Sequence, residues 1–243
     1  MKMRLDLACV EQGLFESREK ALRAIMAGLV AVNGKPADKA GQAVRDGDAV
    51  SLLKSDCPYV SRGGLKLKSA LANFSIEAGG RICLDVGVAT GGFTDCFLQA
   101  GAKKVYAVDV GEGQIHEKIK NDPRVVFIPQ TNARFLKPGI FSEKPGLCAI
   151  DVSFISLKLV LGPVFGVMAP GAEMVALIKP QFELSPADLK RGIVKTEELR
   201  LKAVENMRAF LEDALPGVEE KGLMDSPIKG AKGNLEFLWY LKK

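Results

Sequence analysis

A short apolar run followed by a glycine-rich turn is the feature that most constrains the fold of this chain. Residues 82–86 read Ile-Cys-Leu-Asp-Val, which is typical of a strand buried on both faces of a parallel sheet. Residues 87–92 read Gly-Val-Ala-Thr-Gly-Gly, and residues 91–100 have the spacing of a helix. A strand, a tight glycine turn and a helix in this order predict the first unit of an α/β domain with a doubly wound sheet.

Strand and helix patterns alternate through the rest of the chain. We therefore expect a Rossmann-like, seven-stranded and mostly parallel sheet with helices on both faces. The further elements predicted are strands over 105–110, 125–128, 147–152, 174–178, 218–224 and 235–241, a helix beginning near Ser156, and a helix from Thr196 to about Leu215.

The first 54 residues have a different pattern, which predicts a small α+β domain. Two helices are expected, over residues 4–13 and from Ser17 to Gly28, followed by short strands. Asn33-Gly34 is a strong signal for a tight turn between strands. The predicted organisation is a first domain over 1–54, a linker over 55–61 and an α/β domain over 62–243, which opens with a helix from Leu65 to about Phe74.

Composition and charge exclude several classes of protein. The net charge of +5 permits a nucleic-acid partner but does not require one. The five cysteines are scattered without a C-x-x-C pair and the chain has one histidine, which argues against a disulfide framework, a zinc site and a Ser-His-Asp triad. No apolar run approaches the roughly 20 residues of a spanning helix. We therefore expect a cytoplasmic protein without a metal or a membrane partner.

The glycine-rich turn carries the features of an adenosine-binding site. Asp109 ends the strand after the turn, where its carboxylate could accept hydrogen bonds from both hydroxyls of a ribose. Phe93 stands where a phosphate-binding loop would have Lys, and the turn is not the G-x-G-x-x-G of dinucleotide sites. Asp85, two residues before the first glycine, suits a ligand with a positively charged amino-acid tail.

S-adenosylmethionine is such a ligand, and we expect it in preference to a nucleotide; the turn could also be purely structural. The candidate cofactor-binding residues are Asp85, Gly87, Ala89, Gly91, Gly92, Phe93, Thr94, Asp109, Asn132 and Asp151.

Charged residues interrupt or end several apolar segments. Asp151 and Lys179 each follow a predicted buried strand, and Glu236 stands between Leu235 and Phe237. Lys66 lies on the helix that precedes the sheet. Because an unpaired buried charge is unfavourable, these positions indicate a site rather than a core, although each alone could be a solvated strand end.

The same residues carry a resemblance to a known family. The α/β part resembles the FtsJ-like ribose 2′-O-methyltransferases, whose Lys-Asp-Lys-Glu tetrad is matched by Lys66, Asp151, Lys179 and Glu236. The first domain resembles a small αL RNA-binding domain, on the segments Arg4-Leu5-Asp6, residues 17–21 and Val32-Asn33-Gly34.

Both domains in this order resemble the TlyA family over nearly the whole chain. That family is often labelled hemolysin and includes rRNA 2′-O-methyltransferases acting on cytidines. The resemblance implies an S-adenosylmethionine-dependent methyltransferase whose partners are ribosomal RNA or ribosomal subunits.

Roles for the matching residues follow from this resemblance and from charge. Lys179 is the candidate for orienting or deprotonating the ribose hydroxyl, and as a base it would have to be uncharged. Asp151 and Glu236 would hold the lysines. The candidate phosphate contacts are Arg4, Arg18, Lys20, Arg23, Lys39 and Arg62.

Three alternatives stay open at this point. The loop from Asp188 to Lys195 could close over RNA or cofactor, or be a mobile surface loop. The protein could be a non-enzymatic RNA-binding or ribosome-assembly factor, which would not need the tetrad. It could also be a membrane-active cytolysin, although the sequence has no strongly amphipathic basic helix to support that role.

Overall fold

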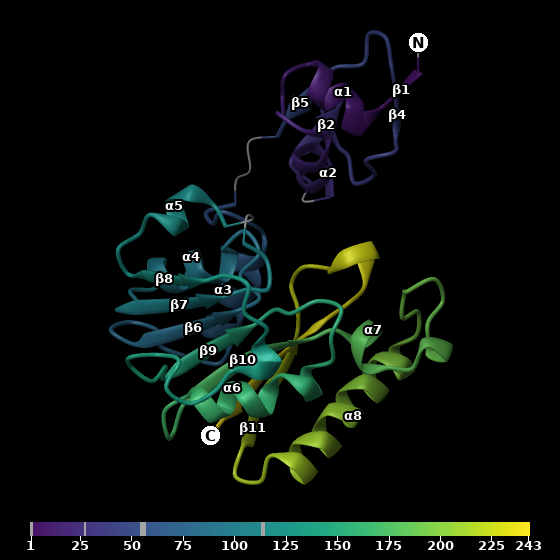
Figure 1. Cartoon of the computed structure of the whole chain (residues 1–243). Coiled ribbons are helices and arrows are strands. Elements are labelled where there is room, and N and C mark those ends of the chain that lie inside the picture. Colours follow the sequence, from purple (N-terminus) through teal and green to yellow (C-terminus); the bar gives the residue numbers. More distant parts are fainter. Residues whose placement is uncertain (1, 27, 54–56, 113–114) are drawn as a thin grey trace. The chain divides into compact units, whose positions relative to one another are not determined.

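The computed structural model describes residues 2–26, 28–53, 57–112 and 115–243 (Figure 1). The chain divides into two compact units, residues 1–58 and residues 59–243, and each is described by itself. Lys54, Ser55 and Asp56, where we expected the first domain to end and the linker to begin, lie outside the described residues.

In its described residues, the smaller unit has two helices and two small antiparallel sheets. One sheet pairs β1 with β4, and the other has the order β3-β2-β5. Leu5, Ile25 and Val30 are fully buried in its core. Its elements are β1 (Lys2–Arg4), α1 (Leu5–Glu11), α2 (Arg18–Met26), β2 (Val30–Val32), β3 (Lys35–Pro36), β4 (Ala43–Arg45) and β5 (Val50–Leu52).

The larger unit is built on one seven-stranded sheet of order β11-β12-β10-β9-β6-β7-β8. Strands β8, β7, β6, β9 and β10 are parallel, and β12 is antiparallel to both of its neighbours. This topology confirms the predicted doubly wound, mostly parallel sheet. Its strands are β6 (Ile82–Val86), β7 (Lys104–Val108), β8 (Val125–Ile128), β9 (Leu147–Ile150), β10 (Glu173–Ile178), β11 (Glu219–Asp225) and β12 (Phe237–Lys242).

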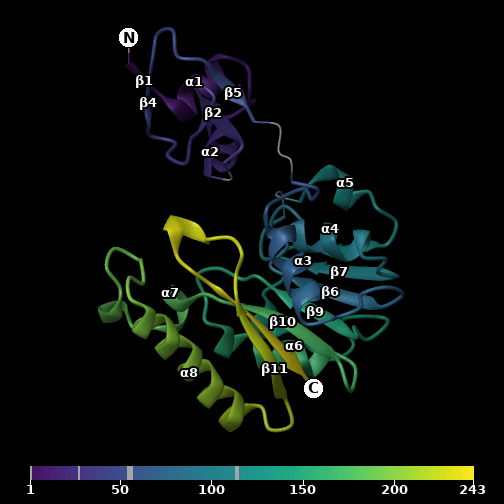
Figure 2. The same ribbon diagram turned by 180° about the vertical axis from the view of Figure 1, so that it is seen from behind.

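Helices cover both faces of this sheet (Figures 1 and 2). On one face α3 and α4 pack against side chains such as Cys83 and Val105, and on the other α6 and α8 pack against Leu84 and Ile150. The alternation of neighbouring strand residues between two apolar cores explains why the central strands β6, β7, β9 and β10 are largely apolar. The helices are α3 (Gly63–Asn73), α4 (Gly92–Gln99), α5 (Glu117–Lys120), α6 (Leu161–Val167), α7 (Pro180–Glu183) and α8 (Glu197–Ala214).

The helix expected near Ser156 begins later than predicted. Ser156 caps a short 3₁₀ helix, Leu157–Leu159, and α6 starts at Leu161. The backbone N–H of Leu157 donates to the Glu183 carboxylate at 2.9 Å, so a side chain of α7 holds the start of this 3₁₀ helix. Thr196, in contrast, caps α8 as predicted, since its hydroxyl accepts a hydrogen bond from the Leu199 N–H.

Candidate active site

The glycine-rich turn brings the end of β6 directly against the end of β9. Gly87 has a φ of +90°, and a Cβ atom there would lie 2.5 Å from the carbonyl oxygen of Asp151. Gly91, with a φ of +94°, stands immediately before α4 and would place a Cβ 3.1 Å from the Ile119 side chain. Glycine is therefore needed at both positions for two reasons: the backbone is left-handed, and a neighbouring group lies too close for a side chain.

Beneath this turn lies Asp85, which is fully buried. Its Oδ2 accepts a hydrogen bond from the Thr94 hydroxyl at 2.6 Å, while Oδ1 has no hydrogen-bond partner among the described residues. Burial raises the pKa of Asp85 to about 7; the Thr94 hydrogen bond opposes this shift, and the charges of Asp151 and Asp109 add to it. Three carboxyl groups therefore interact at the carboxyl ends of β6, β7 and β9.

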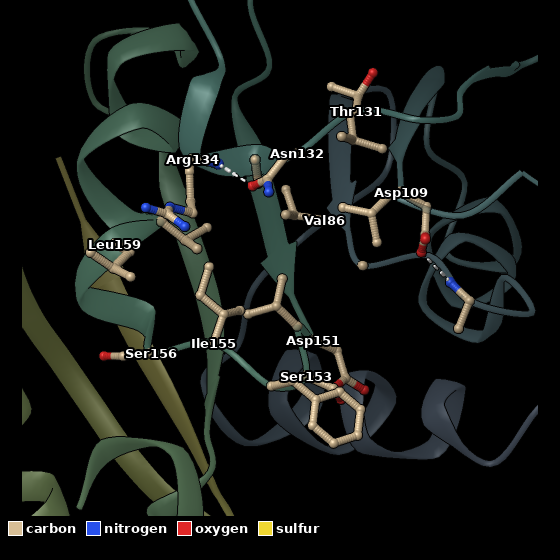
Figure 3. A pocket seen from close by; sticks show the side chains of 18 residues that line it. Val86, Asp109, Thr131, Asn132, Arg134, Asp151, Ser153, Ile155, Ser156 and Leu159 are labelled. Carbon is tan, nitrogen blue, oxygen red and sulfur yellow. Dashed lines mark hydrogen bonds between the residues drawn. The ribbon is translucent and has the colours of Figure 1, made fainter.

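A cavity of about 730 Å³ lies on these strand ends (Figure 3). Five of the candidate cofactor-binding residues line it: Gly87, Ala89, Asp109, Asn132 and Asp151. The other five do not line it: Asp85, Gly91, Gly92, Phe93 and Thr94. They are buried at the base of the turn and in the first residues of α4, where they shape the turn rather than face the cavity.

The walls of the cavity combine apolar and polar groups. Asp109 accepts hydrogen bonds from the backbone N–H of Ala89 at 2.8 Å and of Gly111 at 2.7 Å, so its carboxylate is held firmly at the rim. Asn132 caps a 3₁₀ helix, Ala133–Phe135, by accepting the Arg134 N–H at 3.1 Å. Apolar side chains that the sequence did not single out complete the walls, among them Val86, Val108, Ile155 and Leu159.

The four tetrad candidates lie together as two ion pairs. Lys179 Nζ is 2.6 Å from Asp151 Oδ1, and Lys66 Nζ is 2.7 Å from Glu236 Oε2. The topology explains this gathering: Asp151 and Lys179 follow parallel strands, and Glu236 precedes the antiparallel β12. Because Ile178 pairs with Phe237 in the sheet, Lys179 and Glu236 emerge side by side at the same edge.

The two pairs also interact with each other electrostatically. Burial disfavours the charged form of Asp151, but the positive charges of Lys179 and then Lys66 outweigh it, so the pKa of Asp151 lies below its usual value. Asp151 is therefore a carboxylate at neutral pH. Lys179 also donates to the Ser153 hydroxyl at 2.9 Å, which leaves one of the three ammonium hydrogens for another acceptor.

Phe154 is a residue at the cavity whose position the sequence did not reveal. Its side chain is 92% exposed and its backbone has a φ of +64°, which is unusual for an aromatic residue. The ring lies against Phe182, with centroids 5.5 Å apart. An aromatic residue after a buried strand normally predicts core packing, so no sequence signal indicated this exposure.

In the smaller unit, two of the candidate RNA-binding residues, Arg4 and Arg18, form ion pairs with the same buried carboxylate. Asp6 accepts two hydrogen bonds from Arg4, both at 2.9 Å, and one from Arg18 at 2.8 Å. The hydrogen bonds from Arg4 are the largest cause that holds the pKa of Asp6 well below its usual range. About half of each arginine side chain stays exposed, so both guanidinium groups can bind a further anion.

The other candidate RNA-binding residues are Lys20, Arg23 and Lys39 in the smaller unit and Arg62 in the larger one. Lys20 is exposed and forms an ion pair with Glu16, and Lys39 is exposed in the loop before β4. The side chain of Arg23 lies outside the described residues. Arg62 is exposed at the start of α3, one helical turn before Lys66. In the part of the chain that is described, no helix is long and apolar enough to cross a membrane.

Comparison with known proteins assigns the class of this chain. Residues 59–243 match the FtsJ-like methyltransferase family, and residues 3–50 match the S4 domain. The chain belongs to the FtsJ-like methyltransferase family and carries an S4 domain in front of its methyltransferase domain. The protein is therefore a methyltransferase.

Full-length relatives narrow this assignment to the TlyA family. The chain is 45% identical to the Bacillus subtilis protein YqxC, named as a candidate rRNA methyltransferase, over 99% of this chain and 85% of the relative. It is 41% identical to the 16S/23S rRNA (cytidine-2′-O)-methyltransferase TlyA of Mycobacterium tuberculosis, over 98% of this chain and 89% of the relative. A structure described as a candidate hemolysin from Streptococcus thermophilus superposes with a TM-score of 0.78 at 46% identity, covering 100% of this chain and 88% of that one.

Proposed function

We propose that this protein transfers a methyl group from S-adenosylmethionine to the ribose 2′-hydroxyl of cytidine in ribosomal RNA. One observation carries the proposal: two lysine–carboxylate pairs meet at the sheet edge beside a cavity of cofactor size. The name of the Mycobacterium tuberculosis relative supports the choice of rRNA and cytidine. An rRNA substrate would place the protein in the cytoplasm, where ribosomes are.

The cavity suits S-adenosylmethionine because its charges favour a cationic ligand. Asp109 and Asp151 line it, whereas Arg134 is the basic side chain among the lining residues. We propose that Asp109 accepts the ribose hydroxyls and Asn132 hydrogen-bonds the adenine ring. When bound, S-adenosylmethionine supplies an electrophilic methyl group on a positively charged sulfur.

The tetrad then acts on the hydroxyl of the RNA. A ribose hydroxyl is a weak nucleophile at neutral pH, so it must be aligned and its developing negative charge must be stabilised. Holding both reactants aligned can supply roughly 7–11 kcal/mol of the barrier. We propose that Lys179 meets the hydroxyl oxygen with its third ammonium hydrogen, since Asp151 and Ser153 take the other two. Lys179 would then orient the hydroxyl and stabilise the charge on its oxygen, and the proton that the hydroxyl loses on methylation would pass to solvent. Glu236 holds Lys66 close enough to add its positive charge.

Groups outside the tetrad would bind the RNA itself. Arg4, Arg18, Lys20, Arg23 and Lys39 of the S4 domain and Arg62 at the start of α3 are our candidates for phosphate contacts. The exposed ring of Phe154, which lines the cavity, offers a stacking surface for an unpaired base.

The proposal is tested with Lys179→Gln, assayed for transfer of labelled methyl groups to rRNA and ribosomal subunits. We expect the rate to fall by about 100-fold or more, because the group that faces the hydroxyl is lost. Binding of S-adenosylmethionine, measured by calorimetry, should stay unchanged or become tighter. Lys103→Ala is the matched control, since Lys103 is exposed and pairs with Glu143 away from the tetrad. Full activity of Lys179→Gln would remove this residue from the mechanism, and an inactive wild-type protein would contradict the proposed function.

A further inference from the structure

Two loops adjoin the chain segments that carry Lys179 and Glu236 of the tetrad. One is a hairpin over residues 189–195, which follows Lys179 and the short helix α7. The other, residues 226–236, is closed by a hydrogen bond from the Ser226 N–H to the Glu236 carbonyl oxygen at 2.8 Å. Figures 1 and 2 both show the two loops at the edge of the sheet where α7 lies.

The hairpin is a tight turn with a basic residue in a strained position at its tip. Lys190 and Ile193 exchange two backbone hydrogen bonds of 3.1 and 3.2 Å. Between them Arg191 has a φ of +57° and Gly192 a φ of +77°, as a type I′ turn requires. Arginine has no intrinsic preference for this conformation, whereas Asn or Gly adopts it readily.

The second loop repeats the same feature. Lys232 has a φ of +57° and is followed by Gly233 with a φ of +81°. Lys232 is exposed, so its side chain is not held there by core packing. A left-handed, exposed basic residue therefore stands at the tip of each loop, although Gly or Asn would lower the strain at both positions.

One buried amide joins the two loops to each other. Asn234 is 3% exposed, accepts the Val194 N–H at 3.0 Å and donates to the Gly192 carbonyl oxygen at 3.1 Å. At the tips, a Cβ atom on Gly192 would lie 3.2 Å from the Lys232 ammonium nitrogen. The tips are therefore in contact and fixed by an interaction two residues from Glu236.

The joined loops are also tied to the tetrad. Gly230 lies so close to the Glu236 carboxylate that a Cβ atom there would overlap it.

Five exposed basic residues belong to the loops, and none of them has an ion pair with another described residue: Lys190, Arg191, Lys195, Lys229 and Lys232. The nearby acids Asp188 and Asp225 are paired with Lys202 and Arg200.

We propose that these coupled tips form a phosphate clamp, in which Arg191 and Lys232 bind the RNA backbone next to the nucleotide that enters the tetrad. The inference rests on the proposed RNA methyltransferase function and adds a second RNA-binding surface to that of the S4 domain. Basic side chains without acidic partners are the groups that contact nucleic-acid phosphates. Because Asn234 links the two tips to the segment that carries Glu236, the clamp would hold the RNA backbone at a fixed position relative to the reacting hydroxyl.

The test removes both charges without disturbing the fold. In the full-length double variant Arg191→Gly/Lys232→Gly, glycine fits both left-handed positions, so the thermal midpoint should stay equal or rise. We expect the KM for rRNA to rise about 10-fold or more and the affinity for S-adenosylmethionine to stay the same. The slope of log affinity for RNA against log salt should fall in magnitude by about two, one for each lost phosphate contact.

The control is Lys144→Gln/Lys221→Gln, which removes the same charge from exposed positions. Lys144 lies just before the start of β9 and Lys221 near the start of β11, at the end of the strands away from the two loops. Its KM and salt slope should equal those of the wild type. If both double variants behave alike while the wild type methylates rRNA, the clamp is refuted and the proposed function stands. If the wild type does not methylate rRNA at all, the proposed function fails first.

Discussion

Asp85 shows how a single residue of the site can make stability depend on pH. Its pKa of about 7 in the folded protein, caused mainly by burial, lies above the ordinary value of 3.8. Between these two values the native state retains a proton that the unfolded chain releases. The contribution of Asp85 to the free energy of unfolding is therefore highest below pH 4, and it falls as the pH rises toward 7.

Replacing Asp85 by Asn should remove this dependence. We expect Asp85→Asn to gain stability relative to the wild type between pH 4.5 and 7.5, by roughly 2–4 kcal/mol, since each pKa unit corresponds to about 1.4 kcal/mol. Urea unfolding of both proteins at the two pH values measures the difference, and other groups cancel in the comparison. A difference between the proteins that does not change with pH would show that Asp85 ionises normally.

At the scale of elements, the approach of β6 to β9 depends on one glycine. Gly87→Ala would combine a strained left-handed backbone with a Cβ atom 2.5 Å from the Asp151 carbonyl oxygen. Gly80→Ala is a matched control, because Gly80 has a φ of +69° but nothing within 4 Å of the added Cβ. We expect Gly80→Ala to cost about 1–2 kcal/mol from backbone strain alone.

Gly87→Ala should cost roughly 2 kcal/mol more than Gly80→Ala and weaken S-adenosylmethionine binding. Denaturant unfolding and calorimetric titration of the two variants provide the comparison. Equal stability losses with unchanged affinity would mean that the close contact between the turn and β9 does not shape the cavity.

Elements with a strong periodic pattern could be predicted from the sequence, and short ones could not. The strand 82–86, its glycine turn and the capped helix after Thr196 were predicted within a few residues of their observed bounds. β1 and β4 were missed because three residues give no measurable alternation, whereas the turn at Asn33-Gly34, which joins β2 to β3, was predicted. The four-residue helix α7 was missed for the same reason.

The candidate site, like the fold, could be predicted only in part from the sequence. The meeting of Asp151 and Lys179 could be inferred from the sequence, because both follow parallel strands whose carboxyl ends lie at one edge. Lys66, on a helix, and Glu236, inside a predicted strand, were joined to them by the resemblance to the FtsJ-like tetrad. Which turn residues face the cavity could not be inferred, since that depends on the packing of α4 beneath the turn. The exposure of Phe154 and the link through Asn234 both depend on loop conformation, which sequence periodicity does not report.

At the scale of the whole molecule, the described residues of the two units form separate hydrophobic cores that share no residue. The core of the smaller unit draws only on residues from its own range, and the two cores of the larger unit only on residues after Pro58. A unit of this small size buries a limited share of its surface and has low stability on its own. We therefore expect two separate unfolding transitions in scanning calorimetry, with the smaller unit melting first.

Two perturbations should act on different transitions. Arg18→Ala removes one of the two guanidinium partners of the buried Asp6, which we expect to cost about 1.5–3 kcal/mol and to lower the first transition by about 5–15 °C. S-adenosylmethionine should raise only the second transition, because it binds the larger unit. Lys35→Ala, an exposed change in β3, is the control and should leave both transitions in place. A single transition that responds to both the variant and the cofactor would show that the two units unfold as one.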